Sequence, residues 1–366
     1  MKRRAFLRQG IASSALLFQL RVNGVEAESS TPIPLKNIVQ GKGLYVGAQA
    51  TKGQLSREDL GEFVANNFNM LTAGLELKWA ALRPTPATFD FGGADWMVDF
   101  AAKKSMRFHG HNLCWNVSNP KWFSTVLNPS NSRRMLEEHI TTVAKRYSGR
   151  VDAWDVVNEP IDLRSPRPDG LHTGPWLDML GPEYIDIAFH AAAAADPGAI
   201  RVLNIYQVEQ DQDRSDFVRR ATIDHLKEWL KRGVPIQAIG LQSHIGTSLP
   251  LASESRDQFV RKVRDMGLEV MITELDVNDS HLVDTASAND RDKIVAGYYY
   301  DYLTDVVPLG KTKRITFWTV TDKFNWIDAG SSQGPGRHRP GLLDTDMRPK
   351  PVYDAVAKAL EHLVST

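Results

Sequence analysis

The sequence has almost no cysteine, no net charge and no long apolar segment beyond its N-terminus. Cys114 is the single cysteine in 366 residues, which excludes an intrachain disulfide and a metal cluster built on cysteines. The 44 basic side chains balance 44 acidic ones, so charge gives no reason to expect a nucleic acid or an anionic membrane as partner. A composition of 42% hydrophobic and 24% charged residues is typical of a soluble globular protein. We expect a neutral partner and neither a metal nor a cofactor.

The first 27 residues have the pattern of a bacterial export signal. The segment MKRRAFLRQG carries two arginines followed by Phe, Leu and Arg, which is similar to a twin-arginine signal. The apolar run at 11–20 is too short to span a bilayer, and VEA at 25–27 supplies small residues for cleavage. We therefore predict a signal at 1–27 and a mature domain at 28–366, exported to the periplasm or the medium and free of the membrane after cleavage. A Sec signal and a cytosolic terminus remain alternatives.

Apolar, strand-like segments alternate with helix-like segments along the mature chain. The expected strands are 44–50, 70–76, 106–115, 151–159, 200–206, 236–245, 268–277 and 314–322. The expected helices are 56–68, 94–104, 132–148, 183–195, 215–232, 254–266, 291–307 and 352–364, with Ser56 as a candidate cap. Eight such pairs predict an α/β protein made of a single (β/α)8 TIM barrel. An open doubly wound sheet is the alternative, but no glycine-rich phosphate-binding sequence follows the first strand.

Polar, charged and aromatic residues gather where the expected strands end. In a parallel barrel the loops after the strands form the active-site face, so these residues are expected to meet. They are Glu76 to Trp79, His109 to Trp115, Asn158-Glu159, Asn204 to Tyr206, Gln242 to His244, Thr273 to Asp276, and Trp318 to Trp326. Glu76 and Lys78 also fit a solvated turn, and Trp79 also fits plain packing. For Trp96 a packing role is the better interpretation, and for His109 a structural role.

Two carboxylates among these residues, Glu159 and Glu274, suit the cleavage of a glycosidic bond. That reaction needs one carboxyl group that is protonated, to give its proton to the leaving oxygen, and a second one that is ionised. Different surroundings achieve this by moving the two pKa values apart. Tryptophans suit the apolar faces of sugar rings, whereas Lys78, Asn158, Gln242 and the histidines suit sugar hydroxyl groups.

Six segments resemble glycoside hydrolase family 10, best known as endo-β-1,4-xylanases. They are LKW at 77–79, GHNLCW at 110–115, WDVVNEP at 154–160, GLQSH at 240–244, ITELDV at 272–277 and FWTVTDKFNW at 317–326. They follow the family's order and span essentially the whole mature chain. The resemblance implies a (β/α)8 barrel that cleaves β-1,4-xylosidic bonds of xylan or xylo-oligosaccharides by a retaining double displacement. Its partner would be a β-linked polysaccharide or oligosaccharide, and we expect a monomer.

The resemblance also implies a role for each site residue. Glu159 would be the general acid/base and Glu274 the nucleophile, with their carboxyl groups ~5–5.5 Å apart, as retention requires. Asn158 would hold the sugar's 2-hydroxyl group, and His244, backed by Asp276, would orient Glu274 and keep it ionised. The subsite of the covalent intermediate would be lined by Lys78, His111, Gln242, Trp318 and Trp326. Trp115 lies in the same motif, and both packing and binding remain open for it.

The chain departs from the family's pattern beside this machinery. Gly74 and Leu75 stand where Glu-Asn is common, WNVS replaces WHSQ at Asn116 and Ser118, and NIYQ replaces NDYN at Ile205 and Gln207. In the family, the Glu-Asn pair reads hydroxyl groups of the next sugar toward the non-reducing end. Losing such hydrogen bonds removes about 0.5–1.5 kcal/mol each.

These departures leave two alternatives to an ordinary xylanase. One is the same machinery acting on another β-glycan or on a short, decorated oligosaccharide. The other is a non-catalytic barrel that binds glycans through its tryptophans. The intact set of Glu159, Glu274, His244 and Asp276 argues against the second, because a binding protein has no need of an acid and a nucleophile. The preferred glycan, its length and decoration, and the pH optimum are not determined by the sequence.

Overall fold

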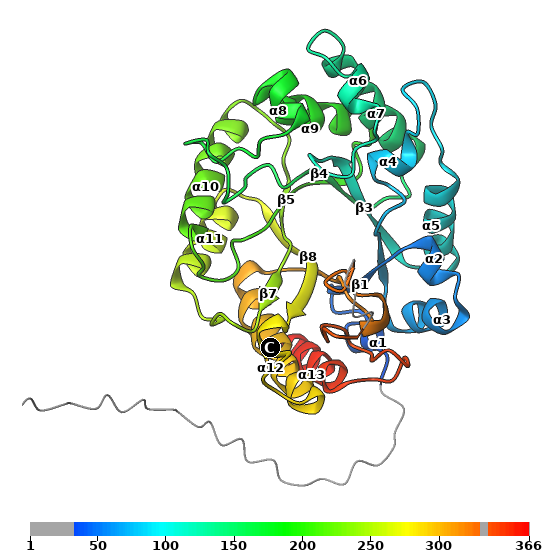
Figure 1. The fold of residues 1–366 in the computed structure, drawn as a ribbon, viewed down its shortest axis with the longest axis vertical. Coiled ribbons are helices and arrows are strands. Elements are labelled where there is room, and N and C mark those ends of the chain that lie inside the picture. Colours follow the sequence, from blue (N-terminus) through cyan, green and yellow to red (C-terminus); the bar gives the residue numbers. More distant parts are fainter. Residues whose placement is uncertain (1–32, 330–335, 366) are drawn as a thin grey trace, which may run out of the picture. The chain divides into compact units, whose positions relative to one another are not determined.

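A computed structural model describes residues 33–329 and 336–365, so the expected signal at 1–27 lies outside the described residues. The described strands pair in parallel in the order β6-β5-β4-β3-β2-β1-β9-β8-β7, and pairing of β6 with β8 closes them into a barrel. They are β1 (Tyr45–Ala50), β2 (Met70–Ala73), β3 (Arg107–Cys114), β4 (Ala153–Asn158), β5 (Ile200–Ile205), β6 (Ala238–Leu241), β7 (His244–Gly246), β8 (Glu269–Asn278) and β9 (Arg314–Phe317). Figure 1 shows these strands as a ring with helices around its outside.

The long helices lie between successive strands, as the alternating pattern predicts. They are α3 (Glu58–Asn67), α5 (Gly92–Lys103), α7 (Ser132–Arg146), α9 (Glu183–Ala195), α10 (Ser215–Lys231), α11 (Glu254–Asp265), α12 (Ala288–Gly310) and α13 (Pro351–Ser365). Shorter helical segments in the loops are α1 (Leu35–Ile38), α2 (Lys52–Leu55), α4 (Trp79–Leu82), α6 (Phe123–Val126), α8 (Pro175–Leu180), η1 (Ser280–Leu282) and η2 (Asp322–Phe324). The (β/α)8 prediction is confirmed, and the open-sheet alternative is wrong because β6 pairs with β8.

Local details differ from the expectations where short helices interrupt the loops. Ser56 does not cap the first long helix; it ends α2, whose N-cap is Thr51 with Gln54 completing a capping box. Sequence pattern missed α2 because a single helical turn is too short to show a period. The sixth expected strand is divided into β6 and β7, with Gln242 and Ser243 between them. The expected strands 70–76 and 314–322 are shorter in the structure, because β2 ends at Ala73 and β9 ends at Phe317. The remaining residues of both expected strands belong to the loops that follow them.

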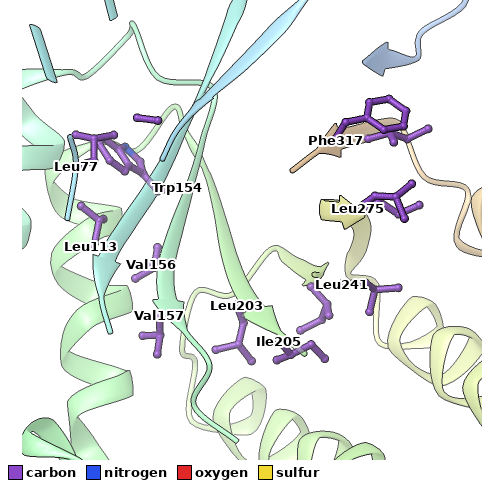
Figure 2. Close-up of a cluster of buried hydrophobic side chains, with 14 of the residues drawn as sticks. Leu77, Leu113, Trp154, Val156, Val157, Leu203, Ile205, Leu241, Leu275 and Phe317 are labelled. Carbon is purple, nitrogen blue, oxygen red and sulfur yellow. The ribbon is translucent and has the colours of Figure 1, made fainter. Parts of the chain in front are cut away.

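The main core lies between the strands and the surrounding helices. Figure 2 shows its strand residues, which include Leu113, Val156, Leu203, Leu241 and Phe317. The barrel interior holds a smaller apolar cluster of Ala153, Val202, Ala238 and Met271. This packing holds the strand ends, and therefore the loops after them, in fixed positions. No helix within residues 33–329 or 336–365 is long and apolar enough to cross a membrane.

Candidate active site

Glu159 leaves the barrel wall immediately after β4. Val156 and Val157 are buried in the wall, and β4 pairing ends at Asn158. Glu159 then has a positive φ of 55°, a left-handed conformation that costs a residue with a Cβ about 1–2 kcal/mol. The bond from its N–H to the Asn204 carbonyl (2.8 Å) supports this conformation. Such local strain is typical of functional positions.

The side chain of Glu159 is contacted by neutral donors. Trp115 Nε1 donates to Oε2 (3.0 Å), whereas Asn158 Nδ2 (3.2 Å) and Gln242 Nε2 (3.0 Å) donate to Oε1. These three donors come from the ends of the third, fourth and sixth strands of the barrel. Trp115 therefore contacts Glu159 directly, and its role in binding a sugar stays a prediction.

Glu274, in contrast, is buried and lies against a positively charged partner. Its carboxylate accepts Asn204 Nδ2 at Oε1 (2.7 Å) and lies 3.2 Å from His244 Nε2 at Oε2. Burial by itself raises the pKa of Glu274, but the hydrogen bond from His244 and the charge of His111 outweigh it and lower that pKa. Glu274 as a whole residue is 4% exposed. Glu274 is therefore held as a carboxylate in a largely dry position.

His244 is kept protonated by the acid behind it. Its Nδ1 lies 2.8 Å from Asp276 Oδ1, and Asp276 also accepts Trp326 Nε1 at Oδ2 (2.6 Å). Burial lowers the pKa of His244, but Asp276 and Glu274 raise it well above the ordinary value. An imidazolium donates from both ring nitrogens. The backing of His244 by Asp276 is thus present in the folded chain, as the resemblance implies.

The Asn204 side chain links Glu274 to Asn158, and sequence reasoning placed it at a strand end without giving it a role. Its Nδ2 donates to Asn158 Oδ1 (2.8 Å) as well as to Glu274, and Thr273 Oγ1 donates to its Oδ1 (2.7 Å). A Cβ at Gly240 would lie 2.3 Å from Asn204 Oδ1, so the glycine leaves room for this side chain. The only sequence signal for Asn204 is its position at the end of the fifth strand.

Two histidines of β3 contact a buried aspartate of β4. Asp155 contacts His109 Nε2 through Oδ1 (2.9 Å) and His111 Nδ1 through Oδ2 (2.8 Å). Burial raises the pKa of Asp155, but the two histidines lower it to about 2. His111 Nδ1 is also 4.0 Å from Glu274 Oε1. His109 thus has the structural role expected of it, whereas His111 lies between Asp155 and the Glu274 carboxylate.

Aromatic and cationic side chains border the two carboxylates. Lys78 Nζ lies 4.4 Å from the centre of the Trp115 ring, and burial lowers its pKa against the opposing charges of Glu274 and Glu159. The Trp318 ring lies 5.2 Å from that of His111, and the Trp326 ring 5.0 Å from that of His244. Trp326 is 49% exposed, which makes it the most exposed aromatic side chain of this group. All eleven site residues predicted from the sequence belong to this connected group: Lys78, His111, Trp115, Asn158, Glu159, Gln242, His244, Glu274, Asp276, Trp318 and Trp326.

Other candidates at the strand ends have structural roles. Glu76 Oε1 accepts the Lys52 N–H (2.6 Å) at the start of α2, and the Trp79 ring stacks on His139 at 3.5 Å in the core. Trp96 stacks on Phe100 along α5 (5.4 Å between ring centroids).

Among the described side chains, no group of three histidine, cysteine or acidic residues is arranged to hold a metal ion.

Some residues that depart from the family pattern lie inside the protein, and others lie on its surface. Asn116, Ile205 and Gln207 are used internally: Asn116 Nδ2 donates to the His172 carbonyl (3.5 Å), Ile205 is in the core, and Gln207 Oε1 accepts the Leu163 N–H (3.4 Å). Ser118 accepts the Ala80 N–H through its carbonyl (3.1 Å), which joins the loops after β3 and β2.

Gly74 and Leu75 change the surface beside Lys78. A Cβ at Gly74 would lie 1.7 Å from Gln49 Nε2, so the Gln49 amide occupies the space of a larger side chain. Leu75 is 58% exposed on the same loop.

Comparison with known proteins matches this chain to one family. The profile of glycosyl hydrolase family 10 matches residues 34–359. Endo-1,4-beta-xylanase B of Thermotoga neapolitana is 30% identical over 94% of this chain and 96% of its own length. The crystal structure of native xylanase 10B from Thermotoga maritima is 30% identical, with a TM-score of 0.81 over 91% of this chain and 99% of that one. Xylanase 10B from Thermotoga petrophila, solved with xylobiose, is 29% identical with a TM-score of 0.80 over 92% and 100% of the two chains.

Proposed function

Because this chain belongs to glycosyl hydrolase family 10, we propose that it is a retaining endo-β-1,4-xylanase that cleaves xylan or xylo-oligosaccharides. One observation of the site carries the proposal: its two carboxylates have unlike partners. Glu274 lies against protonated His244, whereas the described donors to Glu159 are the neutral groups of Trp115, Asn158 and Gln242. This asymmetry suits an ionised nucleophile and a proton-carrying acid.

The reaction then takes two displacements. In the first, a Glu274 oxygen attacks the anomeric carbon while Glu159 gives its proton to the departing glycosidic oxygen, which forms a glycosyl-enzyme. In the second, Glu159 takes a proton from water, the water oxygen attacks the same carbon, and the Glu274 carboxylate leaves. Each displacement inverts the anomeric carbon, so the product keeps the substrate's configuration.

Azide rescue of two alanine variants tests these assignments. Glu274→Ala should abolish hydrolysis of an activated aryl β-xylobioside, and added azide should yield the inverted α-glycosyl azide. Glu159→Ala should keep the first step on the activated substrate, and azide should then yield the β-glycosyl azide with retained configuration. Glu76→Ala is the control and should keep activity without azide, because the Glu76 carboxylate accepts the Lys52 N–H at the start of α2 and contacts neither Glu159 nor Glu274 in the structure. Full activity of Glu274→Ala would refute the proposal.

A second candidate, a decorated oligosaccharide as the preferred substrate, is favoured by the surface beside Lys78. Leu75 and Val117 are 58% and 49% exposed, and their loops are joined by the Ala80–Ser118 bond. Exposed apolar side chains at this point cannot hydrogen-bond the hydroxyl groups of an unsubstituted sugar, but they can pack against an acyl or aryl substituent.

A substrate panel separates these two candidates. Xylan, arabinoxylan, acetylated xylan, mixed-linkage glucan and aryl glycosides would be compared for wild type and for Leu75→Asn. If decoration is preferred, wild type should favour the acetylated substrate and Leu75→Asn should lose that preference. Ile294→Asn, which changes an exposed apolar residue on the distant helix α12, is the control. Equal kcat/KM on plain and acetylated xylan in wild type argues for the ordinary xylanase.

We propose further that residues 1–27 direct export and that the mature enzyme acts as a monomer. The paired arginines at 3–4 support the twin-arginine route, and the oxygens of both carboxylates find their partners within one chain. Replacing both arginines by lysine should leave uncleaved enzyme in the cytoplasm, whereas unchanged export would argue for a Sec signal. Light scattering of the purified enzyme should give the mass of one chain, and twice that mass would contradict a monomer.

A further inference from the structure

The sixth strand of the barrel is interrupted at Ser243, which has a left-handed backbone. Ser243 has φ of 63° and lies between β6, which ends at Leu241, and β7, which begins at His244. A residue with a Cβ in this conformation costs about 1–3 kcal/mol and persists only where its surroundings hold it. The folded chain must therefore support this break.

The residues on either side of Ser243 contact the two reacting carboxylates. Gln242 Nε2 donates to Glu159 Oε1 (3.0 Å), and His244 Nε2 lies 3.2 Å from Glu274 Oε2. A shift of this short segment would therefore disturb the acid/base and the nucleophile together. Displacements of about 1 Å at a catalytic contact can cost 10²-fold in rate.

Glu209 accepts a hydrogen bond from the main chain at this break. Its Oε1 accepts the Ser243 N–H (2.8 Å), and its Oε2 accepts the Val208 N–H (2.9 Å). The adjacent Gln242 N–H still bonds to Ile205 of β5, so Glu209 accepts the amide at the point where strand pairing has stopped. Glu209 is 3% exposed, and each of its carboxylate oxygens accepts a main-chain N–H group.

The side chain of Ser243 is held by a second element. Its hydroxyl lies 2.8 Å from the Tyr302 hydroxyl of α12. Burial raises the pKa of Glu209, while the N–H groups of Ser243, Glu209 and Val208 and the charge of His244 partly offset that rise. Glu209 is thus a carboxyl group in a buried position. An apolar side chain at that position would have no desolvation cost.

We propose that Glu209 is a positioning residue, which sets the Gln242–Ser243–His244 segment so that Gln242 meets Glu159 and His244 meets Glu274. The inference rests on the proposed function, because those two carboxylates are the acid/base and the nucleophile there. Glu209 itself touches neither substrate nor reacting atoms. Its effect is transmitted through one main-chain hydrogen bond.

Alanine and glutamine at position 209 test this role. Glu209→Ala removes the acceptor of the Ser243 N–H, and kcat/KM on an aryl β-xylobioside should fall by about 10²-fold. Because His244 then holds Glu274 less well, the pKa of Glu274 should rise and the acid limb of kcat/KM should move to higher pH. The other charges near Glu274, those of His111, Asp155 and Lys78, are unchanged. Glu209→Gln keeps an oxygen acceptor, so it should recover most of the activity and the wild-type acid limb.

Asp196→Ala is the matched control for a purely structural loss. Asp196 is a carboxylate as buried as Glu209, and it accepts Trp154 Nε1 (3.1 Å) and Ser148 Oγ (2.9 Å) before β5 begins. Its removal should lower the melting temperature without moving the acid limb. If Glu209→Ala does not fold, Tyr302→Phe takes its place, because it removes the hydroxyl group that contacts Ser243. This variant should show a smaller shift of the acid limb in the same direction.

Three results would overturn the positioning role. A folded Glu209→Ala with wild-type kcat and acid limb would do so, and so would a Glu209→Gln as impaired as the alanine variant. If the alanine variant does not fold, an unmoved acid limb in Tyr302→Phe has the same meaning. Failure of the proposed function itself is seen separately, because wild type would then release no product from any xylan or xylo-oligosaccharide.

Discussion

Replacing His244 with alanine tests the pairing that keeps the nucleophile ionised. In the native enzyme, the His244 imidazolium donates to Glu274, and its hydrogen bond and charge both lower the pKa of that carboxyl group. A hydrogen bond to a charged group is worth about 1.5–3 kcal/mol, and one pKa unit corresponds to about 1.4 kcal/mol. We therefore expect the pKa of Glu274 to rise when this hydrogen bond is lost. Because only ionised Glu274 attacks, the acid limb of kcat/KM should move to higher pH by the same amount.

The same substitution leaves a buried carboxylate without its cation. Asp276 is fully buried, and among the residues that the structure describes it would keep only Trp326 Nε1 and Thr319 Oγ1 as side-chain donors. An uncompensated buried charge costs about 3–5 kcal/mol of folding free energy. Neutralising it in the double variant His244→Ala/Asp276→Asn should restore part of that loss. The double variant should therefore be more stable than His244→Ala alone.

The assay combines pH–rate profiles with urea unfolding. The acid limb would be measured with an aryl β-xylobioside for wild type, the two variants and a control, His225→Ala, whose Nε2 bonds to the Asp169 carbonyl away from the site. A reduced kcat with an unmoved acid limb in His244→Ala would refute the reasoning, because His244 would then act on the substrate and not on Glu274. A double variant no more stable than the single one would refute the argument from the unpaired charge.

Three further changes have expected outcomes. A Cβ at Gly110 would lie 2.1 Å from a buried tryptophan ring, so Gly110→Ala should lower the free energy of unfolding by about 1–3 kcal/mol or more in urea. The control Gly297→Ala, in the open middle of a helix, should be neutral or stabilise by about 0.5–1 kcal/mol. Asp155 has its pKa lowered to about 2, so its stabilisation of about 2 kcal/mol is present above pH 4 and is lost as pH falls toward 2. Asp155→Asn should therefore be less stable than wild type at neutral pH by that amount, and the difference in unfolding free energy should vanish near pH 2. Trp326→Phe keeps a ring but loses the indole donor, so KM for xylo-oligosaccharides should rise more than kcat falls, and an unchanged KM would contradict a binding role.

Most of the architecture followed from local patterns in the chain. Each long strand and helix has an apolar spacing that depends on its own residues, which is why α9 was predicted at 183–195 with the bounds found in the folded chain. Glu159 and Glu274 were identifiable because strand ends in a parallel barrel converge on one face. Short elements such as α2 were missed, and Ser56 was misassigned, because one helical turn has no period to detect.

The sequence by itself determined the barrel, the two carboxylates and the absence of an acidic and amide pair at Gly74 and Leu75. Only the tertiary structure decided which residues hold the carboxylates in place. Asn204 meets Glu274 across 70 positions of sequence, and Glu209 meets Ser243 across 34. Such contacts leave no periodic trace in either segment, because they exist only after the barrel closes and brings the ends of its strands together.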